Sequence, residues 1–389
     1  VIVLIGGGVS AYFLYFSHPA GTTVDTPSEN VDLPLAGDAP IVVGGDVPTG
    51  EEVLQPEKVA ARLVKIDKGP VVLGAVAFAV ASTSQHPGPD IAINYVERES
   101  GNVFQYLVRA EVLSRTSNKT VPGVQEAKWV PNGSLAFVRY LSGDTSSTIN
   151  TYGLPTNGST GYFLAQNLND LAVGGTGILT LASSQNGSVG TVARIDGSNG
   201  KQVFSTPLTS LRASFAGNQY LAFTKPSATL PGYAFLINST GSFARIAGPL
   251  AGLVALPSPS GKWALISYVN GNALRMSLVN LATRETIALP VGTVADKCVW
   301  SSKEEAAYCG VPVTIPGDAA YPDDWYQGAV HFNDRIWKIS TAGRFAELIL
   351  DFAKDTEEEL DATGLTLDPL SQVLVFRNKN DGSLWSYEL

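Results

Sequence analysis

The chain has 389 residues, a hydrophobic content of 44 % and a formal net charge of −9. Its 39 glycines, 23 prolines and low charged fraction of 16 % indicate a turn-rich protein and exclude a helical bundle or a coiled coil. Because no basic stripe occurs along the sequence, nucleic acid is excluded as a partner.

The first sixteen residues carry no charge and are mostly apolar, with three consecutive glycines at positions 6–8. Glycine is common in membrane helices, and a complete span needs about 20 residues. We therefore expect residues 1–16 to belong to a transmembrane helix that anchors the chain in the lipid bilayer. A removed signal peptide and a buried core helix are the alternatives.

Residues 17–57 read as an acidic linker rich in proline and glycine. They contain no Lys or Arg, and they hold most of the net charge in eight acids: Asp25, Glu29, Asp32, Asp38, Asp46, Glu51, Glu52 and Glu57. Proline fixes the backbone and like charges repel, so this segment is predicted to be extended. It would hold the following domain away from the membrane.

From residue 58 onward a pattern recurs: a short apolar strand, a tight polar turn, then a second strand of small and apolar residues. The second strands begin at Ile91, Leu135, Leu179, Leu221, Ala264, Ala306 and Leu374, which are 44, 44, 42, 43, 42 and 68 residues apart. A unit of about 42 residues with four short strands is typical of a propeller blade.

Seven copies predict an all-β, seven-bladed β-propeller with four-stranded antiparallel blades over residues 58–389. After Leu374 the chain has room for only one more strand, over 383–388, so the last blade lacks its outer strand. The apolar segment 60–66 precedes the first complete blade. We expect this N-terminal strand to complete the last blade, because closure removes two exposed strand edges.

The long interval before the last copy contains an insertion over 312–332, between the second and third strands of blade six. Its candidate binding residues are the aromatic side chains of Tyr321, Trp325 and Tyr326 and the carboxylates of Asp323 and Asp324. Amphipathic aromatic residues suit an interface. Alternatively, Trp325 covers blade six as a plug while the aspartates cap turns. A second extra stretch is the acidic run 355–361, and a short helix is expected near 352–360.

Two cysteines flank the hairpin of blade six. If Lys303 and Glu304 form its two-residue turn, Cys298 and Cys309 lie directly opposite each other on adjacent strands. Such a pair is within disulfide range, and an extracytoplasmic location would permit its oxidation. We therefore predict a disulfide, with two buried free thiols as the alternative.

Residues with catalytic or metal-binding patterns are scarce. The three histidines are scattered, and no zinc-protease motif, nucleophile elbow or phosphate-binding loop occurs. The expected inner strands, such as 127–130, 213–216 and 253–256, offer almost no acids. We therefore expect no catalytic residues, no metal and no cofactor, and we do not expect an enzyme.

The hairpin turns carry a resemblance to known repeats. Residues 131–134 (PNGS) and 258–263 (SPSGKW) resemble the turns of Tol-associated periplasmic propeller repeats, with Asn132 or Ser260 in place of the usual Asp. More of the chain, over about 58–389, resembles membrane-anchored propellers of candidate-phylum (Parcubacteria-like) bacteria. The segments concerned are 94–98, 100–102, 298–301, 321–328 and 380–385. This resemblance implies a propeller in the cell envelope and implies no activity.

The leading hypothesis is a binding or scaffolding module of the cell envelope, with a protein or glycan partner. The chain would cross the membrane once and place its propeller on the extracytoplasmic side, at the cell surface or in a periplasm-like space. Two alternatives stay open. One is an envelope hydrolase or lyase with a carboxylate site in the propeller channel, and the other is a subunit of a surface filament.

Overall fold

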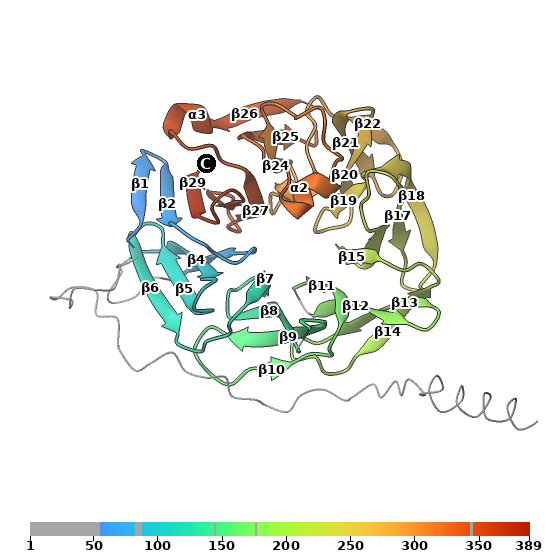
Figure 1. The fold of residues 1–389 in the computed structure, drawn as a ribbon, viewed down its shortest axis with the longest axis horizontal. Coiled ribbons are helices and arrows are strands. Elements are labelled where there is room, and N and C mark those ends of the chain that lie inside the picture. Colours follow the sequence, from blue (N-terminus) through green and yellow to red (C-terminus); the bar gives the residue numbers. More distant parts are fainter. Residues whose placement is uncertain (1–54, 82–87, 144, 176, 343–344) are drawn as a thin grey trace, which may run out of the picture.

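The computed structural model describes residues 55–389 apart from 82–87, 144, 176 and 343–344. In this part of the chain the strands form seven antiparallel sheets, arranged as blades around a central channel (Figure 1). The first strand of each blade lies beside the channel, and the last lies at the rim. The predicted seven-bladed β-propeller is therefore confirmed.

Six blades use four consecutive strands each. Blades one to three contain β3 (Val76–Val80), β4 (Asp90–Val96), β5 (Val103–Leu107), β6 (Val112–Ser117), β7 (Val124–Trp129), β8 (Leu135–Ser142), β9 (Thr148–Pro155), β10 (Tyr162–Phe163), β11 (Leu168–Val173), β12 (Ile178–Ser184), β13 (Gly187–Ala193) and β14 (Lys201–Thr206). Blades four to six contain β15 (Leu211–Ala216), β16 (Gln219–Thr224), β17 (Pro231–Ile237), β18 (Phe243–Ala251), β19 (Val254–Pro257), β20 (Trp263–Asn270), β21 (Ala273–Asn280), β22 (Thr286–Ala288), β23 (Cys298–Trp300), β24 (Ala306–Pro312), β25 (Asp334–Ser340) and β26 (Ala346–Asp351).

Blade seven closes the ring with strands from both ends of the described chain. It contains β27 (Ala362–Leu367), β28 (Val373–Asn378) and β29 (Leu384–Glu388), followed by β2 (Leu63–Asp67) and β1 (Glu57–Ala60). The strand predicted to complete this blade is β2, which pairs antiparallel with β29. The sequence did not predict β1, which forms a hairpin with β2 and gives this blade a fifth strand.

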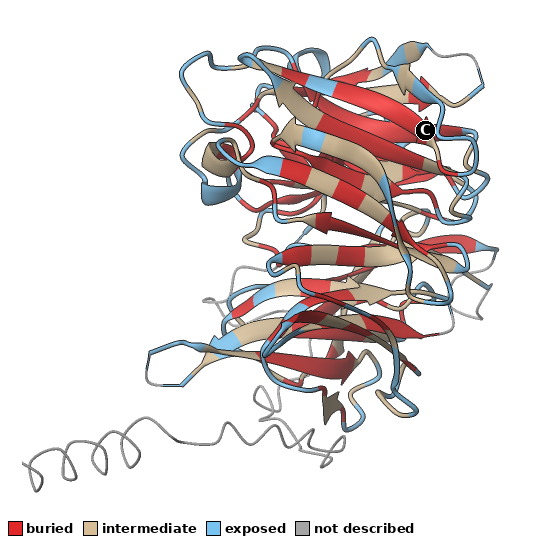
Figure 2. Ribbon diagram, turned by 90° about the vertical axis from the view of Figure 1, so that its right-hand side faces the viewer, coloured by how far each residue is buried: buried red, intermediate tan, exposed pale blue. Residues whose placement is uncertain are grey.

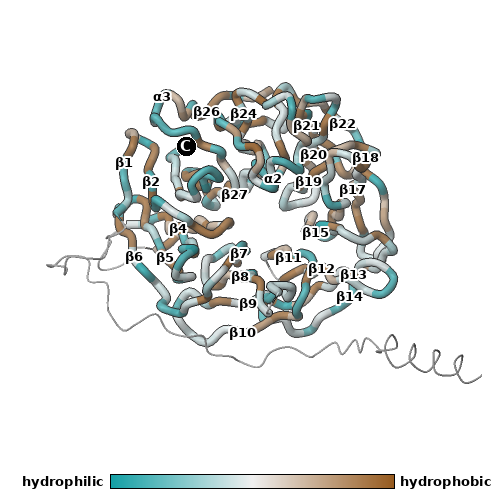
Figure 3. Tube along the Cα trace, in the orientation of Figure 1, coloured by the Kyte–Doolittle hydropathy of each residue, from teal (hydrophilic) through white to brown (hydrophobic). Residues whose placement is uncertain are grey.

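The hydrophobic core is divided among the seven interfaces between neighbouring blades. Each buried cluster combines side chains of two successive blades; for example, Ile93 of blade one packs with Val375 of blade seven. Buried residues follow the strands, whereas exposed and polar residues gather at the connections (Figures 2 and 3). The second strands are the most deeply buried, because both of their faces meet another blade. This explains why they carried the clearest repeat.

Close backbone contact between blades one and two requires a glycine at position 74. Gly74 lies between β2 and β3 with a φ of +105°, and a Cβ at this position would lie 2.0 Å from the carbonyl oxygen of Ala127 on β7. The amide of Ala127 in turn donates to the carbonyl of Leu73. Only a residue without a Cβ allows this contact between blades one and two.

The predicted disulfide between Cys298 and Cys309 is confirmed. The two residues are paired directly on β23 and β24, with Cα atoms 4.1 Å apart. Both are buried between blades five and six. The bond therefore links the two innermost strands of blade six.

Helices are short in the described residues. They are η1 (Ala295–Lys297), α2 (Asp323–Gln327) in the blade-six insertion and α3 (Phe352–Asp355), which begins where a short helix was expected. None of the helices in the described ranges is long and apolar enough to cross a membrane. The predicted anchor over 1–16 and nearly all of the predicted linker over 17–57 lie outside the described residues.

Candidate functional site

One end of the ring gathers the blade-six insertion and most of the charged residues near the channel. Neighbouring strands in a blade are antiparallel, so the connections between second and third strands and those between blades emerge at the same end. We call this end the upper face. It carries residues 313–333 and η1, and the first strands of the blades begin here. Figure 1 shows α2 beside the channel, close to β19 and β27.

The insertion is folded onto the ring by its aromatic side chains. Tyr321 and Trp325 have exposed fractions of only 2 % and 4 %, and both belong to the core cluster between blades four and five. Their rings stack against Phe332, with centroid distances of 5.7 and 6.1 Å. The Tyr321 hydroxyl donates to the carbonyl of Pro316 over 2.8 Å. These two predicted binding residues are therefore buried, and they hold the insertion in place.

The two aspartates of the insertion accept hydrogen bonds from backbone amides. Asp323 accepts from the amide of Ala228, in the upper connection of blade four, over 2.7 Å. Asp324 accepts from the amide of Ala320 within the insertion, also over 2.7 Å. These bonds fix the start of α2 to the rest of the molecule. Among the five predicted binding residues, Tyr326 is the exposed one, with an exposed fraction of 39 %.

Tyr326 is held by an ion pair at the channel mouth. Its hydroxyl donates to Oδ2 of Asp296 over 2.7 Å, and Nη1 of Arg212 reaches the same oxygen over 2.6 Å. Burial opposes ionisation of Asp296, but the Arg212 guanidinium outweighs it and lowers the pKa of that carboxyl. Burial and the neighbouring Asp296 together raise the pKa of the Tyr326 hydroxyl. The phenol is therefore a neutral donor at physiological pH, with its ring fixed in direction.

A second charged network lies across blades two and three. Nζ of Lys128 is 3.3 Å from Glu126 and 3.5 Å from Asp170, while Arg139 reaches Glu126 over 3.0 Å. Burial opposes both charges, yet the cations lower the pKa of Glu126, and the carboxylates raise the pKa of Lys128. Asp170 also accepts from the amide of Ala213 on β15 over 2.9 Å, which ties blade three to blade four.

A third cluster is fully buried beneath α2. Lys297 lies between Asp334, 2.7 Å from its Nζ, and Asp361, with which it forms a second ion pair. Asp361 also accepts from the indole nitrogen of Trp325 over 2.9 Å and from the amide of Phe332 over 3.0 Å. Burial and the charge of Asp361 outweigh Lys297 and raise the pKa of Asp334 to about 6. This cluster holds the insertion to blades six and seven.

Sequence reasoning missed these charged residues because it searched only for acids and took segments 127–130, 213–216 and 253–256 as examples. Lys128, Asp170, Arg212 and Asp296 lie at positions that differ by 42 or by a multiple of 42, which is the blade period. Lys128, Asp170 and Arg212 occupy equivalent register positions on the first strands of blades two to four, and Asp296 lies in η1 just before the first strand of blade six. Comparing residues that are one blade period apart, and looking for charged side chains among them, would have found these residues. The first strands of the seven blades carry two acids, Glu126 on β7 and Asp170 on β11, both outside the segments named in the sequence analysis.

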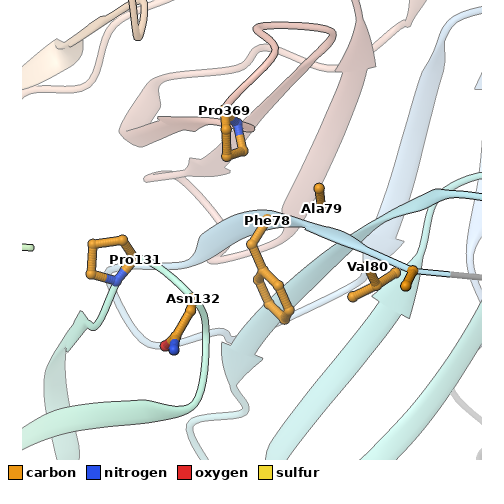
Figure 4. Close-up of a pocket in the computed structure, with 7 residues that line it drawn as sticks. Phe78, Ala79, Val80, Pro131, Asn132 and Pro369 are labelled. Carbon is orange, nitrogen blue, oxygen red and sulfur yellow. The ribbon is translucent and has the colours of Figure 1, made fainter.

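The opposite face carries a shallow, mostly apolar hollow (Figure 4). It lies where blades one, two and seven meet, and Phe78 projects into it from β3. Its lining residues are Phe78, Ala79, Val80, Ala81, Pro131, Asn132 and Pro369. No charged side chain lines this hollow. In the described ranges, moreover, no group of three or more His, Cys, Asp or Glu residues is placed to hold a metal ion.

Known proteins share the fold of this chain. No family profile and no curated protein sequence matches it. An oligogalacturonate lyase from Vibrio parahaemolyticus superposes with a TM-score of 0.52 at 8 % identity, covering 84 % of this chain and 93 % of that one. An oligogalacturonate lyase in complex with manganese gives 0.50 at 8 % identity, over 81 % and 96 % of the two chains.

TolB from Acinetobacter baumannii gives a TM-score of 0.43 at 13 % identity, over 70 % of this chain and 62 % of that chain. What these proteins share with this chain is the fold. Identities this low carry no information on activity, and the TolB likeness is too weak to support an argument.

Proposed function

We propose that this protein is an extracytoplasmic binding module whose upper face recognises a protein or glycan partner. The observation that carries the proposal is the exposed ring of Tyr326, held at the channel mouth by the ion pair of Asp296 and Arg212. An aromatic side chain whose direction is already fixed loses little conformational entropy on binding. Tyrosine and arginine are also the residues that most often dominate binding energy.

The pKa values and the burial of the nearby carboxylates favour a binding site over a catalytic site. A general acid or base works best with a pKa near the operating pH. At the channel mouth, however, Glu126 and Asp296 have lowered pKa values, because Glu126 is paired with Lys128 and Arg139 and Asp296 is paired with Arg212. Asp334 has a pKa of about 6, but its side chain is fully buried. A hydrolase or lyase site in the channel therefore has less support than a binding surface.

The disulfide supports the extracytoplasmic part of the proposal. Disulfides persist in oxidising compartments and are rare in the cytosol. In this account residues 1–16 anchor the chain in the membrane, and the acidic segment 17–57 spaces the propeller from it. The upper face would then be presented to a partner in the envelope or at the cell surface.

The proposal is tested by capture from envelopes of the cells that make the protein, with quantification by mass spectrometry. The full chain is compared with Tyr326→Ala and with a control on the opposite face, Leu370→Ala, whose side chain is 66 % exposed. We expect one partner to be recovered by the parent and by the control but lost by Tyr326→Ala. If all three proteins recovered the same partner equally, the binding site would not include Tyr326, and the proposal for the upper face would fail.

A further inference from the structure

Several cations toward the upper face differ in their partners. Lys128, Arg139, Arg212 and Lys297 each form an ion pair with a carboxylate. Three others, Arg98, Arg377 and Lys379, have no ion pair with any residue in the described part of the chain. The first group ties elements of the ring together, whereas the second carries positive charge that no direct ion pair within the described residues neutralises.

The two arginines are fixed close to each other where blades seven and one meet. Nε of Arg377 donates to the carbonyl of Val71 over 2.7 Å, and the amide of Arg98 donates to the adjacent carbonyl of Pro70 over 3.0 Å. The Arg98 side chain is exposed and donates to Gln125 over 2.9 Å. The Arg377 guanidinium and the Arg98 backbone are thus held on one short connection, and each guanidinium has nitrogens left over for a ligand.

Lys379 extends this group toward the insertion. It follows Arg377 by two residues, and its Nζ lies 5.5 Å from the centre of the Trp325 ring, at the end of α2. Burial lowers the pKa of Lys379, and the charges of Lys297 and Arg377 lower it further against the opposing effect of Asp361. Burial and Arg98 likewise lower the pKa of Arg377. The three cations therefore repel one another, and a bound anion would relieve the repulsion.

We propose that Arg98, Arg377 and Lys379 form a docking site for an acidic segment of a partner protein. The proposal rests on the proposed function and extends it by naming the partner's chemistry. Guanidinium groups bind carboxylates with two parallel hydrogen bonds, so a row of acids on an extended chain matches the row of cations. The exposed Tyr326 follows Trp325 on α2, the residue whose ring Lys379 approaches. Arginines with tyrosine form a surface typical of protein interfaces rather than of small-anion sites.

The test uses the full chain and a fluorescent octaglutamate peptide, with octaglutamine as the uncharged control, and binding is followed by anisotropy at low salt. The variant is Arg98→Gln with Lys379→Gln, because both changes leave the half-buried Arg377 in place. A matched control carries Lys201→Gln and Arg245→Gln, two exposed cations on the outer strands of blades three and four. Thermal unfolding verifies that all proteins are folded.

We expect the Arg98 and Lys379 double variant to weaken octaglutamate binding about tenfold, and the matched control to leave it unchanged. Binding should also fall with rising salt, since the cations are near the surface. The site would be refuted if both double variants bound octaglutamate equally well. It would also be refuted if the parent bound octaglutamine as tightly as octaglutamate. Competition by inorganic phosphate at the same concentration as the peptide would overturn the acidic-segment assignment.

Further results distinguish this docking site from two alternatives: binding of the chain's own acidic linker, and a partner site that involves Tyr326 alone. If neutralising the acids of residues 17–57 strengthened peptide binding, the chain's own linker would be the occupant and the partner assignment would fail. If Tyr326→Ala abolished capture from envelopes while Arg98→Gln with Lys379→Gln did not, the proposed function would stand and the docking site would fail. If Arg98→Gln with Lys379→Gln lost octaglutamate binding while Tyr326→Ala still captured the partner, the docking site would stand and the role of Tyr326 in the proposed function would fail.

Discussion

The buried carboxyl of Asp334 predicts an unusual dependence of stability on pH. Its pKa is raised from 3.8 to about 6 in the folded protein, mainly by burial, while the unfolded chain has the ordinary value. Between these two pH values the folded protein binds a proton that the unfolded chain has lost. The contribution of Asp334 to the free energy of unfolding therefore decreases as pH rises from about 4 to about 6, and two pKa units correspond to about 3 kcal/mol.

The substitution Asp334→Asn isolates this contribution, because the amide cannot ionise and Lys297 keeps its pair with Asp361. Urea unfolding, followed by tryptophan fluorescence at pH values between 4 and 7, gives the free energy of each protein. We expect the free energy of unfolding of the variant, minus that of the parent, to increase by about 3 kcal/mol as pH rises across this range. Taking the difference removes the contribution of the titrating groups that do not interact with Asp334.

Asp361→Asn serves as the control for this experiment. Asp361 binds Lys297, the indole of Trp325 and the amide of Phe332, so its loss is expected to destabilise the protein at every pH, by about 3 kcal/mol. A parent and an Asp334→Asn variant with the same pH dependence would refute the reasoning. That result would mean that the pKa of Asp334 is the same in the folded protein as in the unfolded chain.

Three further predictions concern separate features of the ring. Replacing Cys298 and Cys309 by Ser should lower the free energy of unfolding by about 3 kcal/mol, measured by urea unfolding, with no effect from reductant on the variant. Asp296→Asn should lower the pKa of the Tyr326 hydroxyl, which difference absorbance titration against a Tyr326→Phe background detects; an unchanged titration would contradict the account. Gly74→Ala should prevent the contact of blades one and two, seen as a large fall in the melting temperature, whereas an unchanged melting temperature would disprove the close contact.

The architecture could be predicted because each blade repeats the same local pattern. Second strands are buried on both faces, so Ile91-Ala92-Ile93 and its six counterparts had to be small and apolar, and their spacing gave the number of blades. Pairing of Cys298 with Cys309 followed from turn length alone. Ring closure followed from the missing outer strand of blade seven. These features depend on local sequence and on a single period.

The arrangement of the insertion could not be predicted in the same way. Tyr321 and Trp325 are amphipathic residues in a loop, and only their packing against blades four and five decides that they are buried. The cluster of Lys297, Asp334 and Asp361 joins residues that are 27 to 64 positions apart in the chain, in segments with no shared pattern. Such contacts depend on the tertiary structure, which local patterns do not encode.

We propose above all that the upper face binds a partner. The most direct test places a photo-crosslinking amino acid at position 326 of the full chain, and separately at position 370 on the opposite face, in the cells that make the protein. The account predicts one partner crosslinked from position 326 and none from position 370. The same crosslinks from both positions, or crosslinks from position 370 alone, would contradict it.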